Sequence, residues 1–249
     1  MPQNIYDDPQ FFDGYRALRE QDTGLNGAIE IPAMRALLPS LTGLGVADLG
    51  CGFGDFARFA RIAGARDVLG VDVSARMLEV AKTLTVDASI RYVRITIEEW
   101  SAPPASVDLI VSSLALHYIA DFGSVVRRVT DALVPGGALV FSVEHPMCTA
   151  HPIGWQSAGG RARAYWPVDN YAHEGARHTD WFVTGVVKYH RTVATYLNTL
   201  MHAGLSLVHI EEPEPIAGAL AQRPTLAEES RRPAFLLVSA VKPKQAIPT

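Results

Sequence analysis

The stretch that decides the fold is VADLGCGFGDF, Val46 to Phe56, in which an apolar run ends in glycines at every second position. Glycine adopts left-handed backbone angles and has no Cβ, so a ligand can approach the backbone of such a turn closely. A dinucleotide-binding loop, G-x-G-x-x-G, would also lie between a strand and a helix. Its third glycine is replaced here by Asp55, whose carboxylate would repel a pyrophosphate at the helix N-terminus. The loop of Gly50, Gly52 and Gly54 therefore suits a ligand with no phosphate at this point.

A second motif, VLGVDVS at Val68 to Ser74, ends the next apolar run with an acid. Asp72 follows Gly50 by 22 positions, a spacing at which a carboxylate can accept the hydroxyls of a ribose. Ser74 can cap the following helix, which leaves Asp72 available for a ligand. Asp48 lies inside the first apolar run, where an unpaired carboxylate is costly to bury. A cationic ligand or N–H groups of the loop would satisfy Asp48.

Strands and helices alternate on both sides of the loop. Short runs rich in Val, Ile and Leu, separated by amphipathic helices, predict an α/β fold with a doubly wound, mostly parallel sheet covered on both faces. We expect a single domain, 1–249, that begins with an N-terminal helical segment, 1–43. The predicted strands are 46–49, 68–71, 90–95, 109–112, 138–143, 205–210 and 235–241.

The alternation stops after Pro146. Residues 147–189 are rich in Trp, Tyr, His and Gly and show no helical period, so we expect an irregular segment. We interpret residues 147–190 as an insertion that covers the substrate at the carboxyl ends of the strands, where open parallel sheets bind ligands. Long irregular segments in compact domains are usually functional lids or mobile, and the aromatic content of this one favours a lid.

Composition excludes several classes of protein. A formal net charge of −4 and a pI near 6.1 argue against binding to nucleic acid, which needs clustered basic residues. Two cysteines far apart in sequence do not indicate a disulfide framework. No apolar run approaches the ~20 residues of a membrane helix, and the N-terminus lacks the features of a signal peptide. We expect a soluble, cytoplasmic protein with no membrane partner, of open oligomeric state.

Together these motifs resemble the class I S-adenosylmethionine-dependent methyltransferases. VADLGCGFG is similar to the first motif of that family, and VLGVDVSARML to its second-strand acid and the helix that follows. SVDLIVSSLALHYIAD (106–121) and LVPGGALVFSVEHP (133–146) are similar to the fourth- and fifth-strand segments of the small-molecule branch. The resemblance covers roughly Tyr15 to Pro146 and, more loosely, the final strand pair. It implies a Rossmann-like, seven-stranded sheet with the last strand antiparallel, S-adenosyl-L-methionine as cofactor, and methyl transfer to a small-molecule acceptor.

The resemblance also implies how the cofactor is held. The glycine loop would lie under the methionine and ribose portions, and Asp72 would take the ribose hydroxyls. A methionine at helical spacing is also compatible with plain core, and Glu99 leaves the register of Glu98 open. The other implied cofactor contacts are Val73 and Met77 beside the adenine, Ile97 and Glu98 at its amino group, Ser112 facing the methionine end, and Tyr15 and Arg19 at the methionine carboxylate.

A general base is needed only if the acceptor arrives protonated, and histidine is the natural choice near neutral pH. His117 follows the fourth strand and His145 ends the fifth, so both are candidate catalytic residues. His190 and Glu144 are further candidates. Each histidine could instead satisfy a nearby carbonyl group. No metal is expected, because the scattered Cys and His residues lack the paired spacing of zinc sites.

Two other functions remain open at this point. A protein that binds S-adenosylmethionine without transferring a methyl group would need the same loop and the same acid. An NAD(P)-dependent reductase would share the strand-loop-helix arrangement. The sequence does not identify the acceptor or the atom that is methylated.

Overall fold

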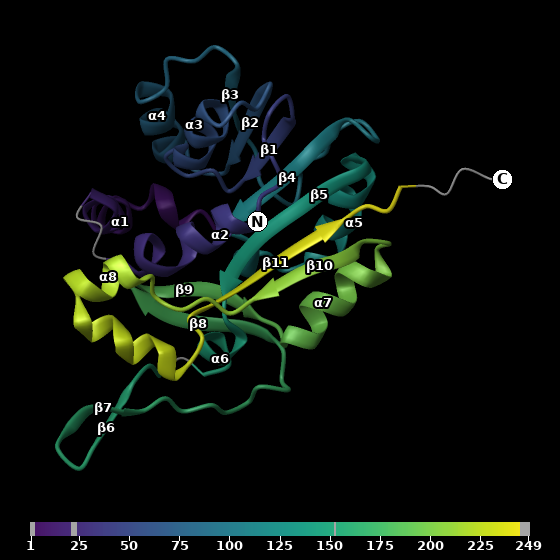
Figure 1. Ribbon diagram of the computed structural model, residues 1–249. Coiled ribbons are helices and arrows are strands. Elements are labelled where there is room, and N and C mark those ends of the chain that lie inside the picture. The colour runs from purple at the N-terminus through teal and green to yellow at the C-terminus, as the bar shows by residue number, and fades with distance from the viewer. Residues whose placement is uncertain (1–2, 21–23, 152, 245–249) are drawn as a thin grey trace.

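The computed structural model describes residues 3–20, 24–151 and 153–244. Its centre is a seven-stranded sheet of order β10-β11-β5-β4-β1-β2-β3 (Figure 1). β1 to β5 are parallel, whereas β11 runs antiparallel to both β5 and β10. The predicted doubly wound, mostly parallel sheet of seven strands is therefore confirmed. The strands are β1 (Gly45–Leu49), β2 (Asp67–Asp72), β3 (Ile90–Arg94), β4 (Val107–Ser113), β5 (Leu133–Glu144), β10 (Ser206–Glu211) and β11 (Phe235–Val241).

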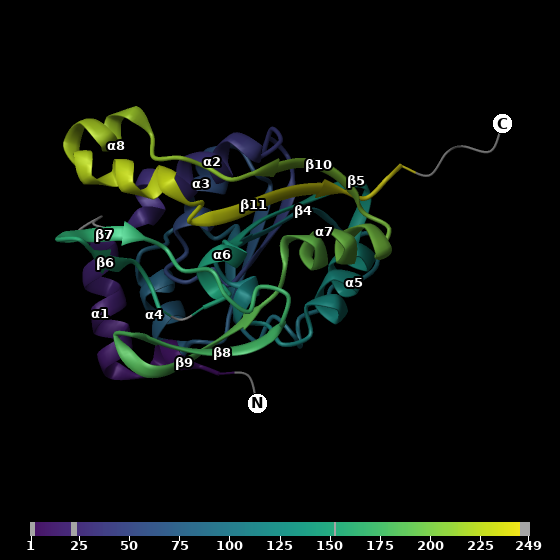
Figure 2. The ribbon, with the colours of Figure 1, turned by 90° about the horizontal axis from the view of Figure 1, so that it is seen from below.

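Helices cover both faces of the sheet (Figure 2). Local signals set where they begin, because Ser74, Asp121 and Thr192 each accept a hydrogen bond from a backbone N–H of the first turn that follows. The helices are α1 (Pro9–Glu20), a π-helical turn (Asn26–Glu30), α2 (Ile31–Leu37), α3 (Asp55–Ile62), α4 (Ala75–Thr83), α5 (Phe122–Ala132) and α7 (Val193–His202). Between β10 and β11, where the sequence shows no clear pattern, lie α8 (Ala217–Gln222) and a 3-10 helix (Pro224–Arg231).

Alternate residues of each strand face two separate cores. Val46 and Val111 pack with α2 and α3, whereas Leu49 and Ile110 pack with α5 and α7. Because neighbouring residues of a strand point to opposite faces, a shift of one position moves a side chain from one core to the other. This alternation decides which side chains reach the carboxyl ends of β1, β4 and β5 on a given face.

The insertion after β5 is regular rather than irregular, which corrects the sequence prediction. It contains a short helix, α6 (Pro146–Thr149), and two antiparallel hairpins. Burial in β8 alternates from residue to residue, so a period of two was present in the sequence but was missed in the search for a helical period. The hairpins are β6 (Gln156–Ala158) with β7 (Arg161–Tyr165), and β8 (Gly175–Trp181) with β9 (Val183–His190).

The tip of the β8–β9 hairpin packs against the N-terminal helix α1. The Gln10 side chain donates a hydrogen bond to the Phe182 carbonyl (3.0 Å), and the rings of Phe11 and Trp181 meet edge to face at 5.2 Å. Figure 2 shows this hairpin crossing below the sheet toward α1. Two segments far apart in sequence thus meet beside the carboxyl ends of the strands.

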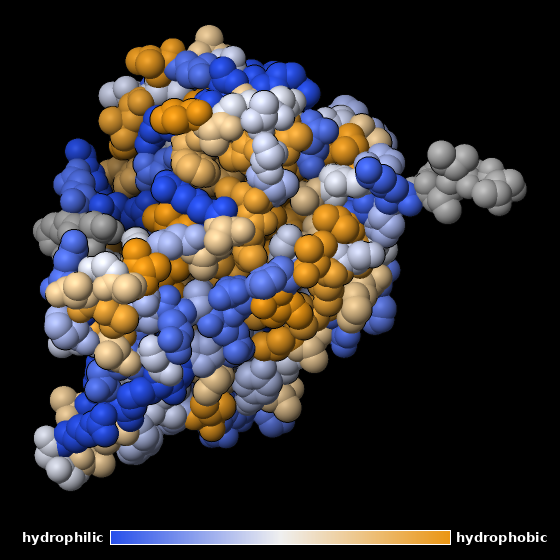
Figure 3. Space-filling view, viewed as in Figure 1, coloured by the Kyte–Doolittle hydropathy of each residue, from blue (hydrophilic) through white to orange (hydrophobic). Residues whose placement is uncertain are grey.

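The outer surface is mixed in polarity (Figure 3). Hydrophobic residues gather over β10, where Val208 and Ile210 are exposed, and the β6–β7 hairpin is mainly hydrophilic. Within the described ranges, no helix is both long enough and apolar enough to cross a membrane.

Candidate functional site

A cavity of about 500 Å³ lies at the carboxyl ends of the central strands. This volume falls within the range of small-molecule sites in proteins. Its walls come from the loop after β1, the ends of β2 and β4, the segment after β3, and the N-terminal helices. The glycine loop after β1 therefore borders this cavity.

The glycines of the loop serve different purposes. At Gly50 (φ +82°) a Cβ would lie 2.4 Å from the Cβ of Ala115, so no larger residue fits. At Gly52 (φ +50°) a Cβ would meet nothing within 4 Å, and this residue lines the cavity. Gly54 (φ +74°) begins α3 beside Tyr92 and is not among the cavity residues. Gly50 and Gly54 thus shape the loop, while Gly52 leaves room for a ligand.

Asp72 ties the end of β2 to this loop. Its carboxylate accepts hydrogen bonds from the backbone N–H of Gly52 (2.9 Å) and of Ser74 (2.9 Å), one on each oxygen. Burial raises the pKa of Asp72, although these two donors partly oppose the rise. Each carboxylate oxygen can accept more than one hydrogen bond, so Asp72 can still accept from a ligand in the cavity that it lines.

Asp48 is a buried acid of the site with incomplete hydrogen bonding. The side chain is 2% exposed, and its Oδ2 atom has no hydrogen-bond partner within the described residues. Burial, with a smaller contribution in the same direction from the nearby Asp72, Asp55 and Glu30, raises the pKa of Asp48 to about 8. No N–H of the loop reaches Oδ2, so of the two partners considered from the sequence only a cationic ligand is left.

The remaining wall on the β2–β3 side contains the residues that were expected beside an adenine. Val73, Met77, Ile97 and Glu98 all line the cavity. Met77 is almost fully buried in α4, so it is both core and cavity wall. The neighbouring Glu99 accepts a hydrogen bond from the Thr96 hydroxyl and is not a cavity residue. The structure thus places Glu98, rather than its neighbour, at the cavity.

Tyr15 and Arg19 project from α1 into the same cavity. The Arg19 guanidinium donates a hydrogen bond to Asp55 (2.9 Å). The carboxylate at the start of α3 is therefore paired with a cation. Burial raises the pKa of the Tyr15 hydroxyl, which keeps it neutral. An arginine and a tyrosine hydroxyl at this end can together receive a carboxylate.

The prediction for Ser112 was wrong. Its hydroxyl is buried and donates a hydrogen bond to the Leu49 carbonyl (2.7 Å), and Ser112 is not among the residues that line the cavity. The next residue, Ser113, lines the cavity instead and donates to Glu30 (2.7 Å). The register of β4 with β1, in which Asp48 pairs with Val111, explains this, because Val111 and Ser113 share a face.

The structure places only one of the predicted histidines, His117, at the cavity. His117 is 2% exposed and lines the cavity, and its Nδ1 atom accepts the backbone N–H of Glu144 (3.4 Å). Since Nδ1 accepts, the ring proton is on Nε2. Burial lowers the pKa of His117 to about 4. At neutral pH His117 is therefore a neutral hydrogen-bond donor and a weak base.

His145 does not reach the cavity, which corrects its prediction as a catalytic residue. Its Nδ1 atom accepts the N–H of Met147 (3.1 Å) at the start of α6, and its Nε2 atom pairs with Glu212 (2.8 Å). His190 is likewise held by the Thr149 hydroxyl (2.8 Å) and the Tyr171 carbonyl (2.9 Å). Both histidines satisfy neighbouring polar groups, the alternative considered from the sequence.

Glu144 lines the cavity beside His117 and is paired with Lys188 of β9 (2.5 Å). Burial raises the pKa of Glu144, but Lys188 and His117 outweigh burial, so the net shift is downward. A partly buried ion pair thus joins the end of β5 to the insertion. Lys188 was not recognised in the sequence, because its partner lies 44 positions away.

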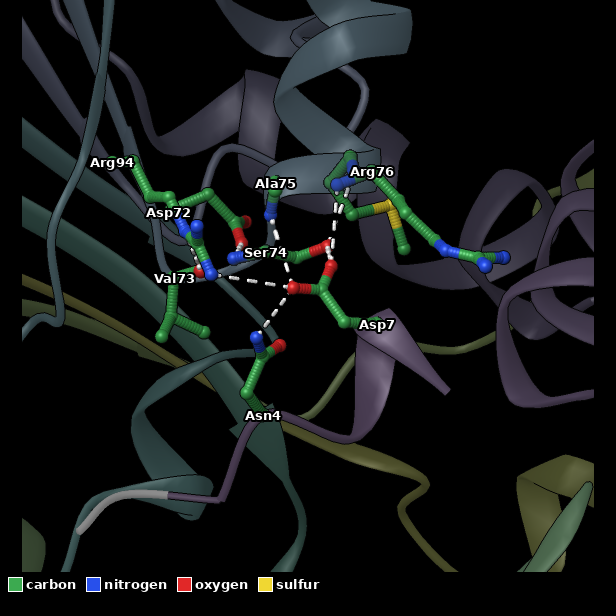
Figure 4. A network of polar contacts seen from close by, with 9 residues as sticks. Asn4, Asp7, Asp72, Val73, Ser74, Ala75, Arg76 and Arg94 are labelled. Carbon is green, nitrogen blue, oxygen red and sulfur yellow. Dashed lines mark hydrogen bonds and ion pairs between the residues drawn. The ribbon is translucent and has the colours of Figure 1, made fainter. Parts of the chain in front are cut away.

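Asp7 ties the N-terminal segment to the start of α4, beside the cavity (Figure 4). Tyr6, which precedes it in the 3-10 turn Ile5–Asp7, lines the cavity. Figure 4 shows the Asp7 carboxylate directed at the first turn of α4, immediately after Asp72. Burial raises the pKa of Asp7, but its donors outweigh burial and the net shift is downward. The donors are the Ser74 hydroxyl (2.5 Å), the N–H groups of Arg76 (3.2 Å) and Ala75 (3.4 Å), and the side chains of Asn4 (2.7 Å) and Arg94 (3.5 Å).

The fold and this site define an α/β protein with a nucleoside-type cavity at the end of a seven-stranded sheet. Residues 47–141 match a family model described as a methyltransferase domain. A solved S-adenosylmethionine-dependent methyltransferase from Mesorhizobium loti is 49% identical, with a TM-score of 0.81, over 88% of this chain and 100% of that chain. An uncharacterized methyltransferase of Mycobacterium tuberculosis is 31% identical over 65% of this chain and 92% of its own length. An uncharacterized protein of Haemophilus influenzae is 36% identical over 96% of this chain and 97% of its own length.

The chain belongs to the class I S-adenosylmethionine-dependent methyltransferases. Its cofactor is S-adenosyl-L-methionine, and the residues fit that cofactor. Open space at Gly52 admits a ligand against the loop, and the unpaired Oδ2 of Asp48 calls for a cation. The reductase and the non-catalytic binding protein that were considered from the sequence are set aside.

Proposed function

We propose that the protein transfers the methyl group of S-adenosylmethionine to a small molecule enclosed in the cavity. The observation that supports this is the continuity of the cavity, which runs from the glycine loop to a second group of side chains. That second group consists of Tyr6, His117, Tyr118 and Glu144. The wall includes residues from Gln3 to Phe235, so we also propose that residues 1–249 form one domain built around one site.

We propose the following contacts for the cofactor. Asp72 accepts the ribose hydroxyls, and Val73, Met77, Ile97 and Glu98 surround the adenine. Gly50 and Gly52 provide the floor, and Tyr15 and Arg19 receive the carboxylate of the methionine portion. Asp48 faces the cationic part of the cofactor. An ionic contact there compensates for the hydration that the Asp48 carboxylate loses on burial.

The cofactor, when bound, supplies the methyl group as an electrophile on its sulfonium sulfur. The protein then has to hold the acceptor in line and keep water out, and well-oriented reactants can gain on the order of 7–11 kcal/mol from positioning. We propose that His117 donates a hydrogen bond from Nε2 to the acceptor and that Glu144 accepts one from it. Lys188 keeps the Glu144 carboxylate ionised for that role.

The proposal of a small acceptor rests on how the cavity is enclosed. Tyr6 and Tyr118 close the acceptor end, and burial raises the pKa of both hydroxyls, so both remain neutral. The insertion, residues 147–190, supports this wall because Trp181 lines the cavity and Lys188 holds Glu144. We propose that a macromolecule would have to displace the N-terminal segment in order to enter this space.

The experiment is a screen for S-adenosylhomocysteine release with purified protein and S-adenosylmethionine. Low-molecular-weight hydroxyl, amine, thiol and carboxylate acceptors are tested beside a protein extract and total RNA. Turnover with a small acceptor supports the proposal. Turnover with the protein or RNA fraction alone contradicts it.

A further inference from the structure

Aromatic rings that meet at nearly right angles form part of the cavity wall at the acceptor end. The four rings, which we call the aromatic box, are those of Tyr6, Tyr15, Tyr118 and Trp181, and all four residues line the cavity. Tyr6 meets Tyr118 at 84° and 6.2 Å, and it meets Tyr15 at 89° and 5.3 Å. Tyr15 meets Trp181 at 87° and 6.0 Å. Rings that meet edge to face direct their faces differently, so the box is a corner and not a flat stack.

One carboxylate lies beside the aromatic box. Glu144 lines the cavity, and its Oε1 atom accepts a hydrogen bond from the Lys188 ammonium (2.5 Å). The Oε2 atom has no hydrogen-bond partner within the described residues and is not among the fully buried atoms. A carboxylate oxygen can accept more than one hydrogen bond, so Oε2 is free to accept from a molecule in the cavity.

Lys188 shows that a carboxylate and a ring at this place can hold a primary ammonium. Its Nζ atom contacts Glu144 and also lies 5.3 Å from the centre of the Trp181 ring. Lys188 is not among the residues that line the cavity, so the cavity side of Glu144 and of the box is left for a ligand. Arg232, another cation that acts on Glu144, is itself paired with Glu229 (2.9 Å).

The electrostatics of this corner favour an acceptor that gains positive charge. Ring faces carry negative charge and attract cations, and the Glu144 carboxylate does the same. Phenols, thiols and carboxylic acids accept a methyl group best as anions, which both features disfavour. They also need a base, whereas burial lowers the pKa of His117 to about 4 and Lys188 keeps the pKa of Glu144 below its usual value. An amine nitrogen reacts while neutral and becomes positive, so the corner stabilises its transition state.

We propose that the acceptor is an amine, held as an ammonium ion between the Oε2 atom of Glu144 and the ring faces of the aromatic box. The inference rests on the proposed function and names the class of acceptor for it. An ammonium nitrogen has no lone pair, so the Nε2–H of His117 donates to an oxygen elsewhere on the acceptor. The ammonium first releases one proton to solvent through Glu144. The amine nitrogen then bonds to the methyl carbon while the sulfur keeps the electron pair of the broken bond, and the product is an N-methylammonium ion.

The first test measures binding without chemistry, in the complex with S-adenosylhomocysteine, which has no methyl group to transfer. The probes are benzylamine, tyramine and 2-aminoethanol, each beside the compound that has a hydroxyl in place of the amino group. Calorimetry at pH 7.5 should show at least one amine bound at least tenfold more tightly than its alcohol. Equal or tighter binding of the alcohol in every pair overturns the proposal, and so does the absence of binding by every amine.

Variants then test the two kinds of contact. Glu144→Gln should weaken the amine at least tenfold and S-adenosylhomocysteine less than twofold, whereas Glu79→Gln, an exposed residue of α4 outside the cavity, should change neither. Tyr118→Phe keeps the ring and should hold the amine within twofold of wild type, whereas Tyr118→Leu should weaken it at least threefold. An amine affinity that Glu144→Gln leaves unchanged, or that both Tyr118 variants lower equally, overturns the proposed contacts. If Glu144→Gln does not fold, the wild-type pairs and the Tyr118 variants still decide the question.

The second test uses S-adenosylmethionine and mass spectrometry of the same probes. We expect an amine to become heavier by one methyl group and its alcohol to stay unchanged. Methylation of alcohols and of no amine overturns the amine class while the small-molecule function stands. Turnover with a protein or RNA fraction alone contradicts the proposed function itself, and a wild-type protein that does not bind S-adenosylhomocysteine contradicts the cofactor contacts.

Discussion

Replacing Asp48 with asparagine should stabilise the cofactor-free protein at neutral pH and weaken its hold on the cofactor. In the folded protein burial raises the pKa of Asp48 to about 8, from an ordinary value of 3.8. When folding raises the pKa of a carboxyl group, the free energy of unfolding is highest below the unfolded pKa. It falls as the pH rises from the unfolded pKa to the folded pKa. At pH 7.5 the wild-type chain must therefore take up a proton at Asp48 in order to fold.

The size of the effect follows from the two pKa values. Protonating a group with an ordinary pKa of 3.8 and a folded pKa of about 8 costs about 5 kcal/mol at pH 7.5 and about 2 kcal/mol at pH 5.5. Asparagine removes this term but leaves a buried amide with incomplete hydrogen bonds, which costs about 1–3 kcal/mol. The net gain in unfolding free energy at pH 7.5 is about 2–4 kcal/mol.

Urea denaturation without cofactor, at pH 5.5 and at pH 7.5, measures this gain. The advantage of Asp48→Asn over wild type should grow by about 2.5 kcal/mol between the two pH values. Asp131→Asn, at an exposed position of α5, should show no such change. An advantage that is the same at both pH values would mean that Asp48 is already ionised in the folded protein, and the reasoning about an unpaired acid would be wrong. Calorimetry at pH 7.5 should show S-adenosylhomocysteine bound at least tenfold more weakly by Asp48→Asn.

Three further predictions concern the ribose, the acceptor and the N-terminal segment. Asp72→Ala should weaken S-adenosylhomocysteine at least tenfold in calorimetry, because each hydrogen bond to a charged group contributes roughly 1.5–3 kcal/mol; unchanged affinity would remove Asp72 from the pocket. His117→Ala should lower kcat at least tenfold and leave the cofactor Kd within twofold, whereas His145→Ala should leave kcat within twofold of wild type; the reverse pattern would restore His145 as the catalytic histidine. Asp7→Asn should release S-adenosylhomocysteine several-fold faster in stopped-flow measurements, because its partners at the start of α4 hold the N-terminal wall closed. An unchanged release rate would show that this wall does not limit exchange.

The features that could be predicted from the sequence are those that depend on residues close together in the chain. Short apolar runs mark the seven strands of the central sheet, and the caps at Ser74 and Asp121 mark the starts of α4 and α5. The order of motifs then predicted the sheet and the loop that borders the cavity. Ser112 was misplaced because the position at a strand end depends on register with β1, which the sequence of β4 alone does not contain.

The missed residues depend on contacts between distant parts of the chain. Glu30 meets serines 83 and 112 positions away, and Asp7 meets Ser74 across 67 positions. In the sequence both are acids near helix starts, where a solvent-exposed carboxylate is the usual outcome. His145 shows the opposite case, because a histidine at the end of a strand is close to the cavity in sequence yet is turned toward Glu212.

The N-terminal wall has a practical consequence for how the protein is handled. Gln3, Ile5 and Tyr6 line the cavity, so a tag or reporter fused ahead of them lies close to the bound ligands. β11 runs antiparallel to β5 and ends at Val241, on the side of the sheet away from the cavity (Figure 1). Fusions at the carboxyl end should therefore preserve ligand exchange, and binding data from amino-terminally tagged material should be compared with material from which the tag has been cleaved.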